Sequence, residues 1–504
     1  MRQFGLVRYI VVVVYLVVIA VIGSAFYKKQ STSKDYFLGG RAMSWLPVAI
    51  SILAADMSAI TVMGCPAWGF RHNLELLVVA CGYPLAAPIV IYVFLPFYTK
   101  LNLYTAYEYL ERRFDLRVRL VTSLLFQALR GVHVAIVIYA PALVINLVTG
   151  LPVWACVLLM GLFTTLYTLL GGMKAVIWTS VIQFFTVMLG MGLVFVSSLS
   201  HLQGGLAAAY RTALDAGRLR LFNFSTDPRD LTSFWACFLG GLVLALAPLA
   251  TDQAILQRLF TTKSVKDCRQ SVIAQAVLVI PANLLLYLAG TALFVFYRYN
   301  SAHLKGLPLD DAVMPFFAVH ELSGVLSGLI VAAILAASMA VMSAGINSLT
   351  TATTVDFYQR VFRPDETPQH YAAVGRIGTV CWGLGMTLLA LFAGRLGALV
   401  LAYNKVASFI VGPLLGIFLL ATMMARATAS GSLFGAGMGA LAVAGVSLGT
   451  EWSFFCQGPI GVVVTVAIGY MASLFTSPPP GEKVRGLVIG HGQSEEAPVV
   501  GEGD

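Results

Sequence analysis

Long apolar stretches, separated by short polar linkers, run through almost the whole chain. A run of about 20 apolar residues is long enough to cross a bilayer as a helix. Thirteen such stretches, numbered here as spans 1 to 13, are centred on residues 8–27, 44–66, 74–98, 118–148, 151–170, 175–199, 233–255, 271–297, 322–350, 371–393, 395–424, 431–449 and 455–475. The pattern therefore predicts an all-α, polytopic membrane protein of thirteen transmembrane helices.

Spans 2 and 7 are each interrupted within their apolar run. Span 2 contains Asp56, and span 7 contains Gly240, Gly241 and Pro248 before Asp252. Interrupted helices at matching places in two halves of a chain indicate an inverted-repeat transporter with a site near the bilayer midplane. The unwound backbone there exposes carbonyl oxygens that can hold an ion. We therefore predict a site between these two spans.

Asp56 is the most informative residue of these interruptions. A carboxylate at bilayer depth is costly unless a cation, a proton or water meets it. Two roles are open for Asp56. It is either a proton carrier that alternates between charged and neutral forms, or a cap that accepts backbone N–H bonds of the broken half-helix.

Composition and charge agree with a membrane protein. The 504 residues are 59% hydrophobic and 11% charged, whereas a soluble protein carries about 25% charged residues. The net charge is +9, and Lys and Arg are concentrated in the linkers after spans 1, 3, 7 and 9. Such linkers lie in the cytoplasm in membrane proteins, so the positive charge does not indicate binding of nucleic acid. We expect a multi-pass protein of the cell membrane with its N-terminus outside and its C-terminus in the cytoplasm.

The last residues differ from the rest of the chain. We expect 1–476 to form the transmembrane domain and 477–504, which begins with prolines and continues with acidic and small residues, to be a disordered cytoplasmic tail. The expected partners are a small solute and the lipid bilayer, with no nucleic acid, and we expect the chain to function as a monomer.

Seven short motifs follow one another along the chain. They include Asp-Tyr-Phe-Leu-Gly-Gly-Arg at 35–41 and Thr-Asp-Gln-Ala-Ile-Leu-Gln-Arg at 251–258, and the others lie at 107–114, 138–142, 171–179, 347–358 and 412–416. With these motifs in this order, the chain resembles the sodium/solute symporter family, whose members transport sugars, iodide, vitamins, monocarboxylates and sialic acids. The resemblance implies five helices plus five inverted helices, here at 44–199 and 233–424, with extra helices at both ends. It also implies import of a small organic solute together with Na⁺.

The resemblance further implies where Na⁺ is held. The family supplies backbone carbonyls, which fall here on Ala54, Met57 and Ala337, together with side-chain oxygens. The two hydroxyl-bearing positions of the family fall on Ala340 and Val341, whose side chains cannot bind a cation.

A second ion site of some members uses a carboxylate where this chain has Ser180, and Ser343 lies one helical turn from Ala340. Two interpretations stay open. Neighbouring oxygens (Ser338, Ser343, Ser180 and Asp56) complete a Na⁺ site, or coupling to Na⁺ is weakened and transport is proton-linked or facilitated.

Cationic side chains within the spans indicate the charge of the solute. Arg130 and His133 share one face of span 4, and Lys405 lies in span 11. Sialic-acid transporters of the family hold the substrate carboxylate with an arginine on the helix of span 4, and the matching position here is His133. These groups favour a small organic anion, although Arg130 is equally explained as the partner of Asp56 or of polar backbone.

Four further residues are expected to line the cavity by the family pattern: Ser58, Thr61, Tyr83 and Trp235. An enzyme is disfavoured, because we find no His, Asp or Glu cluster at metal-ligand spacing. A transporter-like sensor that binds solute without moving it is the remaining alternative.

Overall fold

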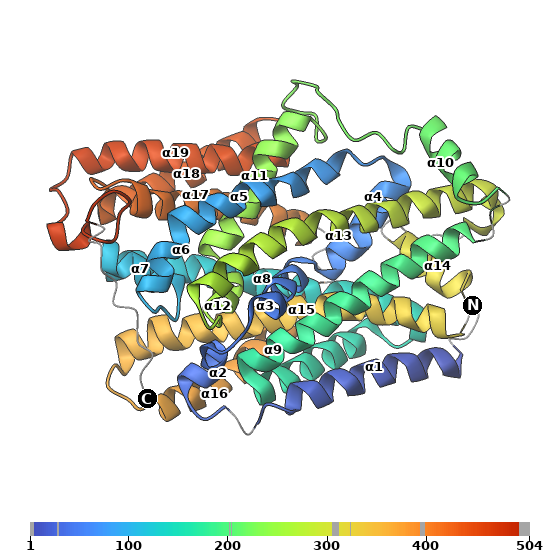
Figure 1. Cartoon of the computed structure of the whole chain (residues 1–504), viewed down its shortest axis with the longest axis horizontal. Helices are drawn as coiled ribbons and strands as arrows, with labels where there is room; N and C mark the ends of the chain where they lie inside the picture. Colours follow the sequence, from blue (N-terminus) through green and yellow to red (C-terminus); the bar gives the residue numbers. More distant parts are fainter. Residues whose placement is uncertain are drawn as a thin grey trace.

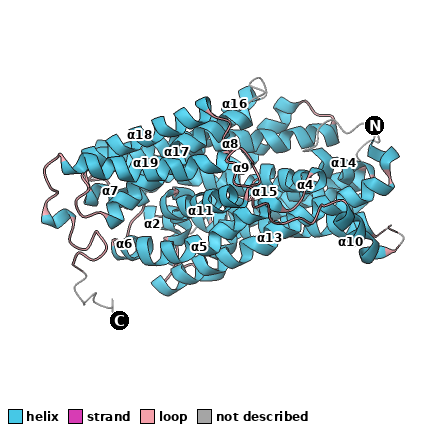
Figure 2. Ribbon diagram, turned by 90° about the horizontal axis from the view of Figure 1, so that it is seen from above, coloured by secondary structure: helices cyan, strands magenta, loops and turns pink. Residues whose placement is uncertain are grey.

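The structure is a computed structural model, and it describes residues 5–27, 30–200, 202, 204–304, 312–322, 324–393 and 399–492. Within these residues it contains helices and no β-strand, apart from one isolated bridge between Met43 and Thr262. In Figures 1 and 2 the long helices run roughly along one direction. Ten of the described helices are long and apolar enough to cross a membrane, or eleven if one bent pair counts as a span. The prediction of an all-α, multi-pass membrane protein is thus confirmed.

The described helices follow the predicted spans in order. They are α1 (Leu6–Ser24), α2 (Ser33–Leu38), α3 (Trp45–Asp56), α4 (Ala59–Arg71), α5 (Gly82–Ile89), α6 (Leu95–Lys100), α7 (Ala106–Arg113), α8 (Leu116–Thr149), α9 (Val153–Leu199), α10 (Gly205–Asp215), α11 (Phe234–Thr251), α12 (Gln253–Leu259), α13 (Val265–Tyr299), α14 (Val313–His320), α15 (Gly324–Ala352), α16 (Pro368–Ala393), α17 (Leu399–Met423), α18 (Ala429–Gly449) and α19 (Phe454–Leu474). Short 3₁₀ and π segments join some of them, including η3 (Glu75–Cys81), η4 (Val90–Phe94) and η7 (Thr353–Phe362).

Predicted spans 5 and 6 fall on the two arms of the single helix α9. The arms meet at Gly172, whose φ of 53° lies in the left-handed region that side chains other than glycine seldom adopt. The number of thirteen spans stays a prediction, because ten or eleven spans are recognised by length and hydropathy in the described residues.

Helix α15 forms the centre of the bundle. All its residues from 330 to 352 are buried, and it packs against α1, α8, α9 and α16. Its sequence is rich in alanine and serine, and such small residues let neighbouring membrane helices approach closely. The predicted Na⁺ carbonyl of Ala337 therefore lies deep inside the protein, at 1% exposure.

Both predicted helix interruptions are present. Helices α3 and α4 are bent by 68° at the break after Asp56. Helices α11 and α12 are separated at Asp252, which has extended backbone angles. In each case a polar side chain begins the second half-helix: Ser58 accepts the backbone N–H of Thr61, and Asp252 accepts that of Ala254.

The start of the predicted tail is not disordered. Residues 477–492 pack against the bundle near α7 and α17, where the Ile489 N–H donates to the carbonyl of Thr422 at 3.0 Å and the Tyr109 hydroxyl donates to that of Leu487 at 2.8 Å. Val488 is 1% exposed. The expectation of disorder fails for 477–492 because apolar residues such as Val488 find a buried place there. Residues 493–504 lie outside the described part.

Figure 1 shows the start of α1 and the segment that follows α19 at opposite ends of the bundle, with α10 near the start of α1 and α7 near the end of α19. This arrangement agrees with termini on opposite sides of a membrane. Which end faces the cytoplasm stays a prediction.

Candidate functional site

A cavity of about 230 Å³ lies beside the break between α3 and α4. Its wall comes from both of these helices, from η3, α5 and α13, and from the start of α19. The polar groups of the wall are the side chains of Asp56, Thr61, Tyr83, Asn283 and Tyr287, and the rest is mainly apolar. Three predicted site residues thus meet at one cavity: Asp56, Thr61 and Tyr83.

Among the lining residues that the structure describes, Asp56 is the only charged one. It is the last residue of α3, and its carboxylate accepts a hydrogen bond from the Tyr83 hydroxyl. The capping role that we considered for Asp56 belongs instead to Ser58, which is 5% exposed and holds the first turn of α4. The carboxylate of Asp56 is therefore directed toward the cavity and Tyr83 rather than toward a helix end.

Arg130 has a different partner from the one expected. Its guanidinium forms an ion pair with Asp252, at the break between α11 and α12, and lies 3.2 Å from Nδ1 of His133. Arg130 is 8% exposed, so an acid is needed to offset its burial. The pair joins α8 to the second broken helix, and neither Arg130 nor His133 belongs to the cavity wall.

Arg258 is a buried cation that our sequence reasoning did not single out. It lies on α12, is 1% exposed, and donates from Nε to the Ser51 hydroxyl of α3 at 2.6 Å and from Nη1 to the carbonyl of Ala254. Its Nη2 has no hydrogen-bond partner among the described residues. The sequence could have indicated this residue, because an arginine next to apolar residues of a membrane protein is costly to bury unless it has a function or a partner. Arg258 links the two broken helices.

The backbone part of the predicted Na⁺ site fits a cation. Ala54 and Met57 lie where α3 ends, and the carbonyls of a final helical turn lack the N–H groups of a next turn. Carbonyl oxygens suit Na⁺ because they replace its hydration shell. All three predicted carbonyl positions, Ala54, Met57 and Ala337, are at most 4% exposed.

The side-chain part of that site is weaker. Ala340 and Val341 are fully packed, and their side chains carry no oxygen. The Ser343 hydroxyl donates to the carbonyl of Ala340 at 3.1 Å, which leaves its lone pairs available. The hydroxyls of Ser180 and Ser338 are buried without a hydrogen-bond partner among the described residues. Serine oxygens therefore exist on α9 and α15, although not at the two positions of the family ligands.

Trp235, like Ser58, Arg130 and His133, does not line the cavity. Trp235 begins α11 at 51% exposure and packs edge-on against Phe234, so its assignment to the cavity is wrong. An exposed tryptophan at the end of a span is typical of an interface anchor. Lys405 belongs to α17, and its side chain lies outside the described part of the chain.

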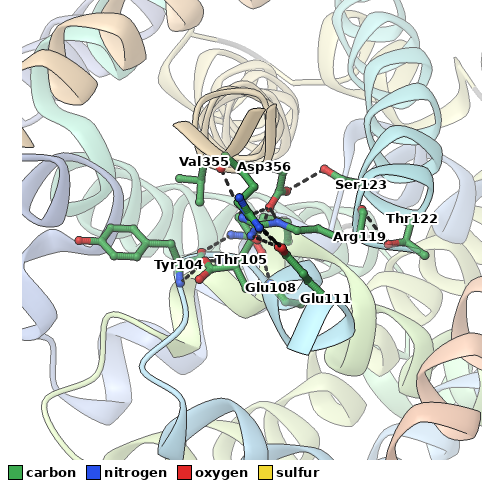
Figure 3. A network of polar contacts seen from close by, with 12 residues as sticks. Tyr104, Thr105, Glu108, Glu111, Arg119, Thr122, Ser123, Val355 and Asp356 are labelled. Carbon is green, nitrogen blue, oxygen red and sulfur yellow. Dashed lines mark hydrogen bonds and ion pairs between the residues drawn. The ribbon is translucent and has the colours of Figure 1, made fainter. Parts of the chain in front are cut away.

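A second polar cluster was missed altogether and is shown in Figure 3. Asp356 of η7 is fully buried and accepts hydrogen bonds from Arg119 Nε at 2.8 Å, from the Thr105 hydroxyl at 2.6 Å and from the Ser123 hydroxyl at 2.7 Å. Arg119 also pairs with Glu111 at 2.8 Å. We call these five residues the end cluster. It fastens α7 and the start of α8 to the segment that continues α15.

Glu111 is the acid of the end cluster that lies outside the membrane-spanning helices. It accepts from Arg119 and, on its other oxygen, pairs with Arg360 at 2.6 Å. Burial raises the pKa of the Glu111 carboxyl, but the hydrogen bonds from Arg360 and Arg119 outweigh burial and hold it below its usual value. Glu111 is therefore charged at neutral pH and holds two arginines at once.

Membrane-spanning helices, two of them broken at polar residues and one of these breaks beside a cavity, are the architecture of a membrane transporter that binds its solute near the midplane. A family model described as the sodium:solute symporter family matches residues 36–439. The chain belongs to this family.

Similar proteins agree with this assignment. The sodium/sialic acid symporter SiaT of Proteus mirabilis is 29% identical over 95% of this chain and 97% of its own length, and the symporter NanT of Aliivibrio fischeri is 31% identical over 94% of each. Human sodium-coupled monocarboxylate transporter 1 is 34% identical over 81% of this chain.

Among solved structures, a Na⁺-coupled sialic acid symporter in a substrate-bound outward-open state has a TM-score of 0.87 at 28% identity, and the match covers 94% of this chain and 99% of that one. The nucleobase-cation-symport-1 transporter Mhp1, with a TM-score of 0.54 at 15% identity, shares the fold alone.

Proposed function

We propose that this chain carries a small organic solute across the membrane by alternating access, with the solute bound at the polar groups around the two helix breaks. The observation that carries the proposal is that both broken helices of a symporter-family chain meet around buried polar groups. Helix breaks supply the oxygens and dipole ends that bind solutes and ions inside a bilayer. The two sets of helices, at about 44–199 and 233–424, are proposed as inverted repeats that move against each other.

The first candidate solute is a small organic anion. The relatives are named for sialic acid, monocarboxylates and iodide, all of which are anions. In this chain an anion would take the place of Asp252 beside the guanidinium of Arg130, since a planar fork binds a carboxylate by two hydrogen bonds. Exchange of one carboxylate for another keeps Arg130 paired throughout.

The second candidate is a solute that carries a protonated amine. It is favoured by one observation: the cavity wall contains a carboxylate, Asp56, and no cation, while the rings of Tyr83, Tyr287 and Phe455 lie in the same wall. A carboxylate and aromatic faces both attract an ammonium group.

Na⁺ coupling is proposed to be weaker than in a chain with both family hydroxyls. The carbonyls at Ala54, Met57 and Ala337 remain, but Ala340 and Val341 offer no side-chain oxygen. When bound, Na⁺ would stabilise the bent form of α3 and α4 by holding the end of α3 against α15. The alternative is transport that is independent of Na⁺ or linked to protons through Asp56.

The end cluster is proposed to close one end of the pathway. It lies toward the end of the bundle near α7, where we predict the cytoplasm, and its contacts join segments that are 237 residues apart. Release of solute at that end would require the pair between Arg119 and Asp356 to separate.

Uptake into proteoliposomes tests these proposals. Labelled sialic acid, a labelled short-chain monocarboxylate and a labelled diamine are offered in Na⁺ and in K⁺ media, with protein-free vesicles as the blank. Uptake of an acid supports the first candidate, and uptake of the diamine supports the second. Equal rates in Na⁺ and K⁺ support weak coupling, whereas loss of uptake in K⁺ would contradict it. Solute binding measured by thermal shift, without uptake of the same solute, would favour a sensor.

A further inference from the structure

A second, apolar groove lies away from the solute cavity. Its volume is about 570 Å³, and it runs between the end of α9, the face of α10 and the last turns of α13. The lining is almost wholly apolar and includes Phe195, Leu206, Tyr210, Leu288 and Val295. None of the residues around this groove also lines the cavity beside Asp56. It is therefore no part of the solute path described above.

The groove opens on the outer surface of the bundle. Leu206 and Tyr210, which form its α10 side, are 67% and 57% exposed. Figure 1 shows α10 lying beside the end of α13, outside the central helices. The other wall belongs to α9 and α13, which are both long and apolar enough to span the bilayer. The groove therefore has one wall from two helices that are able to span a bilayer and one wall from α10, which is not among those helices.

Two arginines stand at its end. Arg218 precedes the lining residue Leu219, and its guanidinium lies over the ring of Phe294 at 4.1 Å. Arg298 follows the lining residue Val295 by one turn of α13. Phe294, which the Arg218 guanidinium covers, lies four residues and so about one turn before Arg298 on α13, which places the two cations at the same end of the groove. Burial and the charge of Arg298 both lower the pKa of Arg218.

These cations lack the acid that would offset them. Among the residues that the structure describes, neither Arg218 nor Arg298 forms an ion pair. Arg218 donates from Nη1 to the carbonyl of His72 at 2.6 Å, while its Nε is buried without a hydrogen-bond partner. Two neighbouring like charges repel, so an anion between them would be stabilising.

We propose that the groove holds an acyl chain of a phospholipid with an anionic headgroup, whose phosphate contacts Arg218 and Arg298. The apolar lining and the cationic end match the two parts of such a lipid. Clustered Lys and Arg beside spans bind anionic lipid headgroups, each contributing to affinity. Phosphatidylglycerol fits both parts, whereas a free phosphate would use the arginines alone and a neutral lipid would use the groove alone.

Native mass spectrometry and thermal unfolding of the full chain in detergent test the proposal. Phosphatidylglycerol, phosphatidylcholine of the same chains, and inorganic phosphate are each added to the intact chain. Phosphatidylglycerol is expected to stay bound and to raise the unfolding temperature more than either of the others. Equal stabilisation by inorganic phosphate would show an anion site without a lipid chain, and equal retention of phosphatidylcholine would show unselective binding. Either result would overturn the proposal.

Two variants separate headgroup from chain. The double variant Arg218→Gln/Arg298→Gln removes the headgroup contacts and is expected to weaken phosphatidylglycerol binding about tenfold or more. Ala207→Trp adds bulk at an exposed position in the groove and is expected to reduce binding of the acyl chain. Arg229→Gln and Ala216→Trp, exposed positions outside the groove, are the matched controls. Unchanged binding in both test variants, with unfolding temperatures near the parent's before lipid is added, would refute the proposal.

Discussion

Replacing Asp356 by asparagine tests whether the end cluster holds the pathway closed. The substitution keeps the shape of the side chain and removes its charge. Asp356 is fully buried and accepts from Arg119, Thr105 and Ser123. An amide group offers one oxygen in place of two, so at least one of these donors loses its acceptor.

The size of the effect follows from burial. Breaking a buried ion pair by removing one partner costs about 3–5 kcal/mol, because the remaining charge is left without its partner. Arg119 keeps Glu111 at 2.8 Å, so we expect a value near the lower end, about 3 kcal/mol. If the cluster forms only while this end is closed, the same energy raises the open population relative to the closed one about a hundredfold.

Labelling of Cys65 provides the assay, since this half-buried thiol lines the cavity. The exposed thiols of Cys81 and Cys381 are first replaced by serine. A membrane-impermeant maleimide is then applied from either side of oriented vesicles. Asp356→Asn is expected to shift labelling of Cys65 strongly toward the side on which α7 lies.

Glu366→Gln is the matched control. Glu366 pairs with Arg363 at 3.9 Å in the same part of the chain, but the Arg363 side chain is 66% exposed and that of Glu366 is 35% exposed, and pairs in contact with solvent contribute about 0–1 kcal/mol. This control should leave labelling unchanged. If Asp356→Asn also leaves it unchanged in protein that is still folded, as judged by its unfolding temperature, then the cluster does not control access and our reasoning is wrong.

Three further predictions concern Na⁺, pH and packing. Ala340→Ser/Val341→Ser should raise the affinity for Na⁺ about tenfold, by adding hydroxyl oxygens to the carbonyl set; unfolding temperatures over a NaCl series, with KCl as control, check this, and an unchanged response would count against the site. The pKa of Glu111 is lowered in the folded protein, so its contribution to stability is complete above the unfolded value near 4.5 and is lost as pH falls further; unfolding measured from pH 7 down to about pH 2.5 should show this loss in the parent and less of it in Glu111→Gln. Gly82→Ala should destabilise by about 1–3 kcal/mol, because a Cβ there would overlap the backbone of α11, whereas Gly64→Ala has open space and should be neutral; equal unfolding temperatures would contradict the packing.

The helices and their breaks were predictable because their causes are local. Apolar runs long enough for a bilayer identify membrane helices. Asp56 and Asp252 each mark a break, since a polar residue at such depth is unfavourable in a continuous apolar helix. Thr61 and Tyr83 meet Asp56 at one cavity, and their role in substrate binding stays a prediction.

Partners of charged residues were not predictable, because they come from distant parts of the chain. Arg130 pairs with Asp252, 122 residues away, rather than with Asp56. Arg119 lies close to an expected helix start, where an arginine is usually a surface charge. Its pairing with Asp356, which is distant in the sequence, is visible only in the structure. The assignment of Trp235 to the cavity failed for a related reason. An aromatic residue in an apolar run is equally compatible with a cavity wall and with the interface between membrane and water.

One sequence signal along α8 connects the two polar regions. Arg119, Ser123, Gln127 and Arg130 are spaced by four, four and three residues, so they share one face of the helix. Each forms a contact in the structure: Arg119 and Ser123 with Asp356, Gln127 with Ser123 and Thr353, and Arg130 with Asp252.

In the proposed transport cycle, this polar face allows α8 to connect the solute site with the end cluster. At 1.5 Å per residue the two arginines are about 16 Å apart along the axis, and the helix between them is continuous. Arg130 pairs with Asp252 at the break between α11 and α12, while Arg119 pairs with Asp356 of the end cluster. A solute that replaces Asp252 beside Arg130 would therefore act on the same rigid helix that carries Arg119. Binding at the centre and opening at the end are coupled to the extent that α8 moves as one body.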